Sequence, residues 1–162
     1  MSKSDSDLTV RVGTVEDMDA MMELAMQANE ENGIIRADYA KMATDMWCGL
    51  TQDHGIVGII GGPGNIIEGA VLLRLGTMWY SDEPVVEEKA VFIRPEYRSA
   101  RGGRARRLCE FSKQVADSLG MPLIIGVLSN QRTEAKIRLY RRQFGEPAGA
   151  FFLYGAKTGA AP

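Results

Sequence analysis

Apolar and polar residues follow two different periods along the chain, and the changes of period predict the order of its elements. Residues 8–12 alternate apolar and polar side chains, as expected of a half-buried strand. Residues 14–31 and 37–50 instead place apolar side chains three and four positions apart, which is typical of amphipathic helices. Thr14 is the expected N-cap of the first helix. The chain therefore begins with a strand followed by two helices.

The middle of the chain reads as strands. Residues 55–60 and 65–75 are rich in aliphatic and β-branched side chains, and the glycine-rich stretch 61–64 between them predicts a hairpin. A loop over residues 76–86 then leads to another predicted strand, residues 87–93. Three consecutive strands are expected here.

The second half of the chain predicts helices alternating with strands. After an Arg- and Gly-rich turn, an apolar stripe from residue 105 to residue 119 predicts a helix that ends at Gly120. Residues 122–128 form an expected strand, Asn130 an expected cap of a helix that runs to about residue 142, and residues 151–154 a last short strand. The whole order predicts one α/β domain with a central sheet.

Composition supports a single globular domain over residues 1–162, with disordered or flexible tails at 1–7 and 156–162. The chain has 45% apolar and 25% charged residues, which is ordinary for a folded domain. It contains no apolar run long enough to cross a membrane and no leader pattern, so we expect a cytoplasmic protein. Two isolated cysteines and the single His54 predict neither a metal site nor a Ser-His-Asp triad.

The formal net charge of −2 hides a strong segregation of charge. Residues 1–93 carry 6 basic and 16 acidic side chains, whereas residues 94–142 carry 12 basic and 4 acidic ones. A basic stretch of this kind in a near-neutral chain predicts an anionic ligand. The alternatives are a solvated basic helix face and a nucleic-acid binding module, but few aromatic residues accompany the arginines.

The segment that carries most information is residues 91–105, where an apolar strand runs into a turn that opens a long helix. The first N–H groups of a helix have no intrahelical partner and carry the positive end of its dipole. Gly102 and Gly103 would let the backbone approach a bulky anion closely. This arrangement predicts an anion site, most naturally for phosphates.

These residues resemble the signature of the GNAT acyltransferases, [R/Q]-x-x-G-x-[G/A] after an apolar strand. The turn Arg98-Ser99-Ala100-Arg101-Gly102-Gly103 matches it with one departure, because Arg101 stands where the first glycine usually stands. Downstream, the series Asn130, Ala135, Leu139-Tyr140 and Phe144-Gly145 resembles the second motif of that family. The predicted order of elements agrees with the family over nearly the whole chain.

The resemblance implies a mixed, twisted sheet that splays between the strands 87–93 and 122–128, with acetyl-CoA bound in the splay. Backbone groups of Val91 and Ile93 would pair with the pantetheine arm, and the turn that follows would hold the pyrophosphate. The implied cofactor contacts are Val91, Phe92, Ile93, Arg98, Ser99, Ala100, Arg101, Gly102, Gly103, Arg104 and Asn130. We expect the Arg101 side chain to point outward; the alternative is a turn that it blocks.

The resemblance also implies a reaction, the attack of a neutral primary amine on the thioester carbonyl. Tyr140 matches the tyrosine that protonates the leaving thiolate in many members, although its helical spacing also fits a core aromatic. For the base, Glu87 and Glu88 would point to opposite sides of a regular strand. Glu87 shares a side with Val91 and Ile93, so we choose Glu87, with a water relay or no dedicated base as the alternatives.

The acceptor side is predicted from the helices and loop that line it in the family. These contribute acidic and aromatic residues, Glu30, Glu31, Asp38, Trp79, Tyr80, Asp82 and Glu83. Such an entrance favours a cationic amine, with plain surface acidity as the alternative. Family members are often homodimers, although no pattern here marks an interface. A GNAT-fold protein that binds CoA without catalysis is a further alternative.

Overall fold

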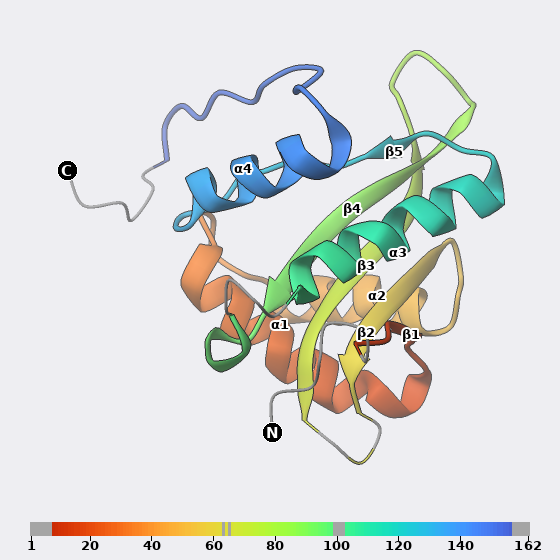
Figure 1. The fold of residues 1–162 in the computed structure, drawn as a ribbon, viewed down its shortest axis with the longest axis vertical. Helices are drawn as coiled ribbons and strands as arrows, with labels where there is room; N and C mark the ends of the chain where they lie inside the picture. The colour runs from red at the N-terminus through yellow and green to blue at the C-terminus, as the bar shows by residue number, and fades with distance from the viewer. Residues whose placement is uncertain (1–7, 63, 65, 99–102, 157–162) are drawn as a thin grey trace.

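A five-stranded sheet with helices on both faces forms the framework of the protein (Figure 1). The computed structural model describes residues 8–62, 64, 66–98 and 103–156. In chain order its elements are β1 (Arg11–Val12), α1 (Met18–Asn32), α2 (Tyr39–Leu50), β2 (Gly55–Gly61), β3 (Ile67–Thr77), β4 (Pro84–Ile93), α3 (Arg104–Leu119), β5 (Leu123–Ile124) and α4 (Thr133–Phe144).

The strands lie in the order β1-β2-β3-β4-β5, and every neighbouring pair is antiparallel except β4 with β5, which is parallel. The predicted mixed sheet and the β2–β3 hairpin are therefore confirmed. A helix must intervene between parallel neighbours, and α3 makes that crossover between β4 and β5 (Figure 1).

Two apolar layers hold the helices against the sheet. One face of β2, β3 and β4 packs against α1 and α2 through side chains such as Met22, Leu50, Val57 and Leu72. The other face packs against α3 through Val71, Leu73, Val86, Leu108 and Phe111. Residues 71, 72 and 73 thus alternate between the two layers, which is the side-chain period of a strand with both faces covered.

Strands β4 and β5 separate soon after they meet. Only two residue pairs join them, Val86 with Leu123 and Glu87 with Ile124. Residues 125–128 leave the ladder, so the predicted strand 122–128 is much shorter than expected. The predicted splay between these strands is present, and it leaves the C-terminal half of β4 without a neighbour on that edge.

A β-bulge interrupts β4 before this open edge. On β3 the consecutive residues Leu72 and Leu73 pair with Ala90 and Glu88, so Lys89 is one extra residue on β4. An extra residue reverses the side to which every preceding side chain points. Glu88 therefore lies on the α3 face together with Val91, and Glu87 lies on the opposite face.

Several boundaries of the expected strands and loops differ from those in the structure. The first strand covers only Arg11–Val12, and the described residues 151–154 form no strand and are exposed. The loop after β3 is limited to residues 78–83, because β3 and β4 extend further than the apolar pattern indicates. The tail predicted at 1–7, and all but residue 156 of the tail predicted at 156–162, lie outside the described residues. No helix in the described part of the chain is long and apolar enough to cross a membrane.

The predicted end of α3 at Gly120 is confirmed, whereas the predicted N-cap Thr14 precedes a 3-10 turn, Val15–Asp17, and α1 begins only at Met18. Gly120 closes α3 in the left-handed conformation at φ 63°. At the start of α1, the buried Asp17 accepts a hydrogen bond from the Thr14 N–H at 2.9 Å and two from Arg11, at 2.9 and 2.7 Å. The hydrogen bonds from Arg11 lower the pKa of the Asp17 carboxyl, more than burial raises it. This contact ties β1 to the first helix.

We expect Asp17→Asn to destabilise the fold by about 2 kcal/mol at pH 7, because it removes a buried ion pair and leaves Arg11 uncompensated. The pKa of Asp17 is lowered on folding, so its contribution is complete above the unfolded value and disappears as the pH falls through the folded value. Urea unfolding of both proteins at pH 7 and near pH 2 measures this. An equal loss of stability at both pH values would show that the charge is not responsible.

Candidate active site

A cavity of about 690 Å³ lies where β4 has parted from β5. The C-terminal end of β4 and α4 contribute most of the lining residues, and the first turn of α3 and the last residues of α1 contribute the others. The lining residues include Glu31, Asn32, Val91, Phe92, Ile93, Tyr97, Arg98, Gly103, Arg104, Arg106, Cys109, Arg132, Lys136, Tyr140, Arg142 and Gln143. The predicted anion-binding turn and the predicted tyrosine thus meet in one cavity.

The open edge of β4 presents backbone groups to this cavity. The Arg94 N–H donates to the Glu68 carbonyl on β3, and hydrogen-bonded and non-hydrogen-bonded residues alternate along an antiparallel strand. The next outward-facing residues are therefore Ile93 and Val91, which pair with Gly69 and Val71 without ladder bonds. The Ile93 carbonyl accepts from Arg98 Nε at 2.7 Å, as this orientation requires.

The turn after β4 ends at the N-terminus of α3. Gly103 immediately precedes the helix at φ 62°, a left-handed conformation that a residue with a side chain rarely adopts. The positive end of the α3 dipole therefore faces the cavity. Ser99, Ala100, Arg101 and Gly102 lie outside the described residues, so the expected outward direction of Arg101 stays a prediction.

Two arginines of the predicted turn are bound by carboxylates. Arg98 Nη2 donates to Glu31 Oε2 at 2.9 Å, and its Nη1 lies 2.9 Å from Oε1 as an ion pair without hydrogen-bond geometry. Arg104 Nε donates to Glu68 Oε2 at 2.8 Å. The same guanidinium groups lie over aromatic rings, at 4.9 Å from the centre of Phe92 and 5.1 Å from that of Tyr97. These contacts tie Arg98 and Arg104 to α1, to β3 and to the end of β4, and they largely balance the charge of both arginines.

Tyr140 lines the cavity and is hydrogen-bonded to a carboxylate, that of Glu88, which is not itself among the lining residues. Tyr140 on α4 is buried, and its hydroxyl donates to Glu88 Oε2 on β4 at 2.8 Å. Burial raises the pKa of Glu88 to about 7, and the Tyr140 hydrogen bond and the charge of Lys136 oppose this rise. Burial and the negative charge of Glu88 both raise the pKa of Tyr140. At neutral pH the pair therefore holds a half-ionised carboxyl beside a protonated phenol.

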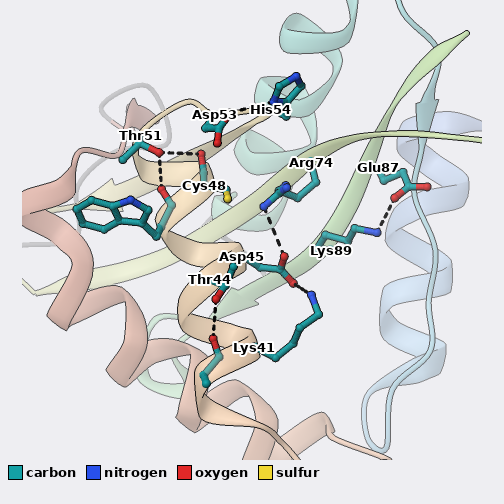
Figure 2. A network of polar contacts seen from close by, with 12 residues as sticks. Lys41, Thr44, Asp45, Cys48, Thr51, Asp53, His54, Arg74, Glu87 and Lys89 are labelled. Carbon is teal, nitrogen blue, oxygen red and sulfur yellow. Dashed lines mark hydrogen bonds and ion pairs between the residues drawn. The ribbon is translucent and has the colours of Figure 1, made fainter. Parts of the chain in front are cut away.

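The choice of Glu87 as the residue beside Tyr140 is corrected by the structure. Figure 2 shows the Glu87 carboxylate bound to Lys89, with Oε2 2.5 Å from Nζ, on the face that also carries Arg74 and Asp45. Alternation along a regular strand would have placed Glu87 with Val91, but the extra residue at Lys89 reverses the sides. Glu88 occupies the position that the sequence assigned to Glu87.

Two further groups adjoin the Glu88–Tyr140 pair. Lys136 lies one helical turn before Tyr140 and lines the cavity; burial lowers its pKa, while Glu88 and Glu31 oppose that change. Cys109 on α3 is buried, and burial followed by the charge of Glu88 raises its pKa to about 12. A thiol with so high a pKa is a poor nucleophile, in agreement with the interpretation of Cys109 as a core residue.

Asn130 does not cap α4. Its backbone N–H donates to the Asn32 carbonyl at the end of α1, and the residue before the helix is Arg132, at φ 60°. The predicted helix start is therefore wrong by two residues, since α4 begins at Thr133. Asn130 is also absent from the described lining of the cavity, where Asn32 occurs instead.

The predicted acceptor residues are dispersed. Only Glu31 lines the cavity, whereas Trp79 and Tyr80 pack edge to face on the exposed β3–β4 connection, with ring centres 5.6 Å apart. His54 is exposed beside Asp53, as expected of a surface residue (Figure 2). The described residues contain no group of three or more potential metal-ligating side chains from His, Cys, Asp and Glu.

Sequence reasoning named Tyr140 on α4 but missed the basic residues on the same wall of the cavity. Arg132, Lys136 and Tyr140 follow each other at intervals of four, which places them on one face of the helix. That spacing alone would have brought Lys136 into the site together with Tyr140.

Burial of Glu88 makes a prediction about stability and pH. The folded pKa of about 7 exceeds the ordinary glutamate pKa of 4.5, so the destabilising effect of this group appears as the pH rises between those values. We expect Glu88→Gln to increase the free energy of unfolding by roughly 3 kcal/mol at pH 8 and hardly at all at pH 4.5. Urea titrations at both pH values measure it, with Glu87→Gln on the opposite face as the control. The same gain in both variants would refute the assignment.

Comparisons with known proteins agree on the fold. No protein-family model and no curated protein sequence matches the chain. Among solved structures, AAC(6')-Iy in complex with the bisubstrate analogue CoA-S-monomethyl-acetylneamine is similar at a TM-score of 0.67 and 16% identity, over 91% of this chain and 96% of that one.

Two further structures extend the similarity. The aminoglycoside acetyltransferase meta-AAC0020, from an uncultured soil metagenomic sample, has a TM-score of 0.67 and 16% identity, with 94% and 99% of the two chains covered. The ribosomal-protein-alanine N-acetyltransferase of Brucella melitensis has a TM-score of 0.66 and 11% identity, with 91% and 97% covered. The expected resemblance is confirmed at the level of structure: this chain has the fold of the GNAT acetyltransferases.

Proposed function

We propose that the chain transfers an acyl group, with acetyl as the first choice, from its CoA thioester to a primary amine. The observation that carries this proposal is the Glu88–Tyr140 hydrogen bond in the wall of a cavity that also contains an open strand edge and a helix N-terminus. Amine acylation by a thioester needs a proton acceptor for the amine and a proton donor for the thiolate. Both stand here on rigid elements.

The acyl donor would lie along the open edge of β4. The outward backbone groups of Val91 and Ile93 suit the amides of a pantetheine arm, and the α3 N-terminus with the turn 98–104 suits a pyrophosphate. Arg98, Arg104 and Arg106 form ion pairs with carboxylates. Among the described lining residues, further phosphates would therefore be met by the cations of the α4 wall, Arg132, Lys136 and Arg142.

The chemistry assigns one role to each member of the pair. Glu88, with a pKa of about 7, is suited to accept a proton from the attacking amine. Tyr140, which remains protonated at neutral pH, is suited to donate one to the departing sulfur. Glu88 takes the place of Glu87 in this proposal, and Tyr140 keeps the role that the resemblance implied.

The acceptor is an amine that we propose to be cationic in solution. The C-terminal end of α1, which carries the negative end of a helix dipole, brings Glu31 and Asn32 to the cavity. The buried Asn32 Oδ1 accepts no hydrogen bond within the described residues. The similar structures include an aminoglycoside acetyltransferase and a ribosomal-protein-alanine N-acetyltransferase.

The first test is binding. We expect acetyl-CoA and CoA each to raise the melting temperature by about 5 to 10 °C at roughly one hundred times their Kd, whereas a single-stranded oligonucleotide gives no shift. Stabilisation by the oligonucleotide alone would favour a nucleic-acid binding module that uses residues 94–142. No shift with either CoA species would contradict the proposal.

The second test separates an enzyme from a protein that only binds CoA. Release of CoA thiol from acetyl-CoA is followed with spermidine, an aminoglycoside or a peptide N-terminus as acceptor. Acyl transfer to at least one amine supports the proposal, and tight CoA binding with no transfer to any of them supports the non-catalytic alternative. A homodimer and a cytoplasmic location stay predictions of the resemblance.

A further inference from the structure

The base and the acid of the proposed reaction share a single hydrogen bond. Tyr140 Oη lies 2.8 Å from Glu88 Oε2, and the phenolic hydrogen is the one that lies between them. We infer that Glu88 and Tyr140 work as one proton relay, in which the proton taken from the amine replaces the one that Tyr140 gives to the leaving thiolate. This inference rests on the proposed function.

The direction of the Tyr140 hydroxyl supports a coupled order of events. A phenol has only one hydrogen, and while Glu88 is ionised that hydrogen is donated to its carboxylate. Once Glu88 has taken a proton, it can donate to Tyr140 Oη, and the phenolic hydrogen is then free to turn toward the cavity. Tyr140 thus becomes an effective acid only after Glu88 has acted as a base.

The complete step balances without a further reactant. The amine enters in its neutral form and its nitrogen forms a bond to the thioester carbonyl carbon, while one N–H proton passes to Glu88. The carbon–sulfur bond breaks with its electron pair on sulfur, which takes the phenolic proton of Tyr140. Glu88 then returns its proton to Tyr140 Oη. The products are an amide and a free thiol, and both side chains recover their starting state.

The surroundings of the pair leave few competing routes. The titratable groups that act on Glu88 and Tyr140 are Lys136 from α4 and Cys109 from α3. Cys109 keeps its proton, because burial raises its pKa to about 12. Lys136 is a cation that favours the ionised form of Glu88. Neither group replaces the direct bond between carboxylate and phenol.

A double-mutant cycle tests the relay. Glu88→Gln and Tyr140→Phe are each expected to lower kcat for acetyl transfer by about 10²- to 10³-fold, and the double variant to be no more than about threefold slower than the worse single variant. If the acid and the base acted independently, the fold-loss of kcat in the double variant would equal the product of the two single losses. That result would overturn the relay. Glu87→Gln, on the other face of β4, is the matched control and should stay within about twofold of wild type.

A second measurement does not depend on turnover. Carbon-13 NMR of labelled glutamate in the intact protein should give Glu88 a pKa near 7, which moves upward in Tyr140→Phe because the phenol no longer stabilises the carboxylate. An unchanged pKa would show that the hydrogen bond is absent and would overturn the relay. Failure of wild type to acetylate any amine would instead overturn the proposed function, even with the shifted pKa observed.

Discussion

The one-residue bulge in β4 is the constraint on which the site depends. It occurs at Lys89, two residues after Glu87 makes the last pair with β5, so β4 changes the side of its side chains and loses a neighbouring strand within a few residues. The extra residue turns Glu88 toward α3 and α4. The departure of β5 leaves the outward backbone groups of Val91 and Ile93 without a neighbouring strand. Without the extra residue, the Glu88 carboxylate would point to the opposite face of the sheet. If β5 continued beside β4, its backbone would pair with the outward groups of Val91 and Ile93.

The charges of the chain are balanced more locally than their distribution along the sequence indicates. Residues 94–142 carry an excess of basic side chains, but Arg98 and Arg104 bind Glu31 and Glu68 from the acidic part. These pairs hold the end of α1 and the β3 strand against the turn. The cations that remain toward the cavity come mainly from α4, which makes that helix, with the α3 N-terminus, the natural partner of a phosphate-bearing ligand.

Local sequence patterns predicted the elements that have one clear period. The helix stripes, the glycine at the end of α3 and the hairpin of β2 and β3 were all predictable, because each depends on neighbouring residues. The bulge was not, because nothing in residues 84–93 distinguishes an extra residue from regular alternation until β3 is placed beside them. The ends of β5 and the missing last strand likewise depend on which edges pair in space. Tyr140 was found through its motif, whereas Lys136 could have been found through its spacing.

The central proposal is that an acyl-CoA binds along the open edge of β4 beside the Glu88–Tyr140 pair. The most direct measurement follows backbone amide resonances of nitrogen-15-labelled protein during titration with acetyl-CoA. We predict the largest chemical-shift changes at Val91, Ile93, Gly103 and the first turns of α4, all of which line the cavity or lie beside it. Shifts confined to the opposite face, around Asp45, Arg74 and Glu87 (Figure 2), would contradict it.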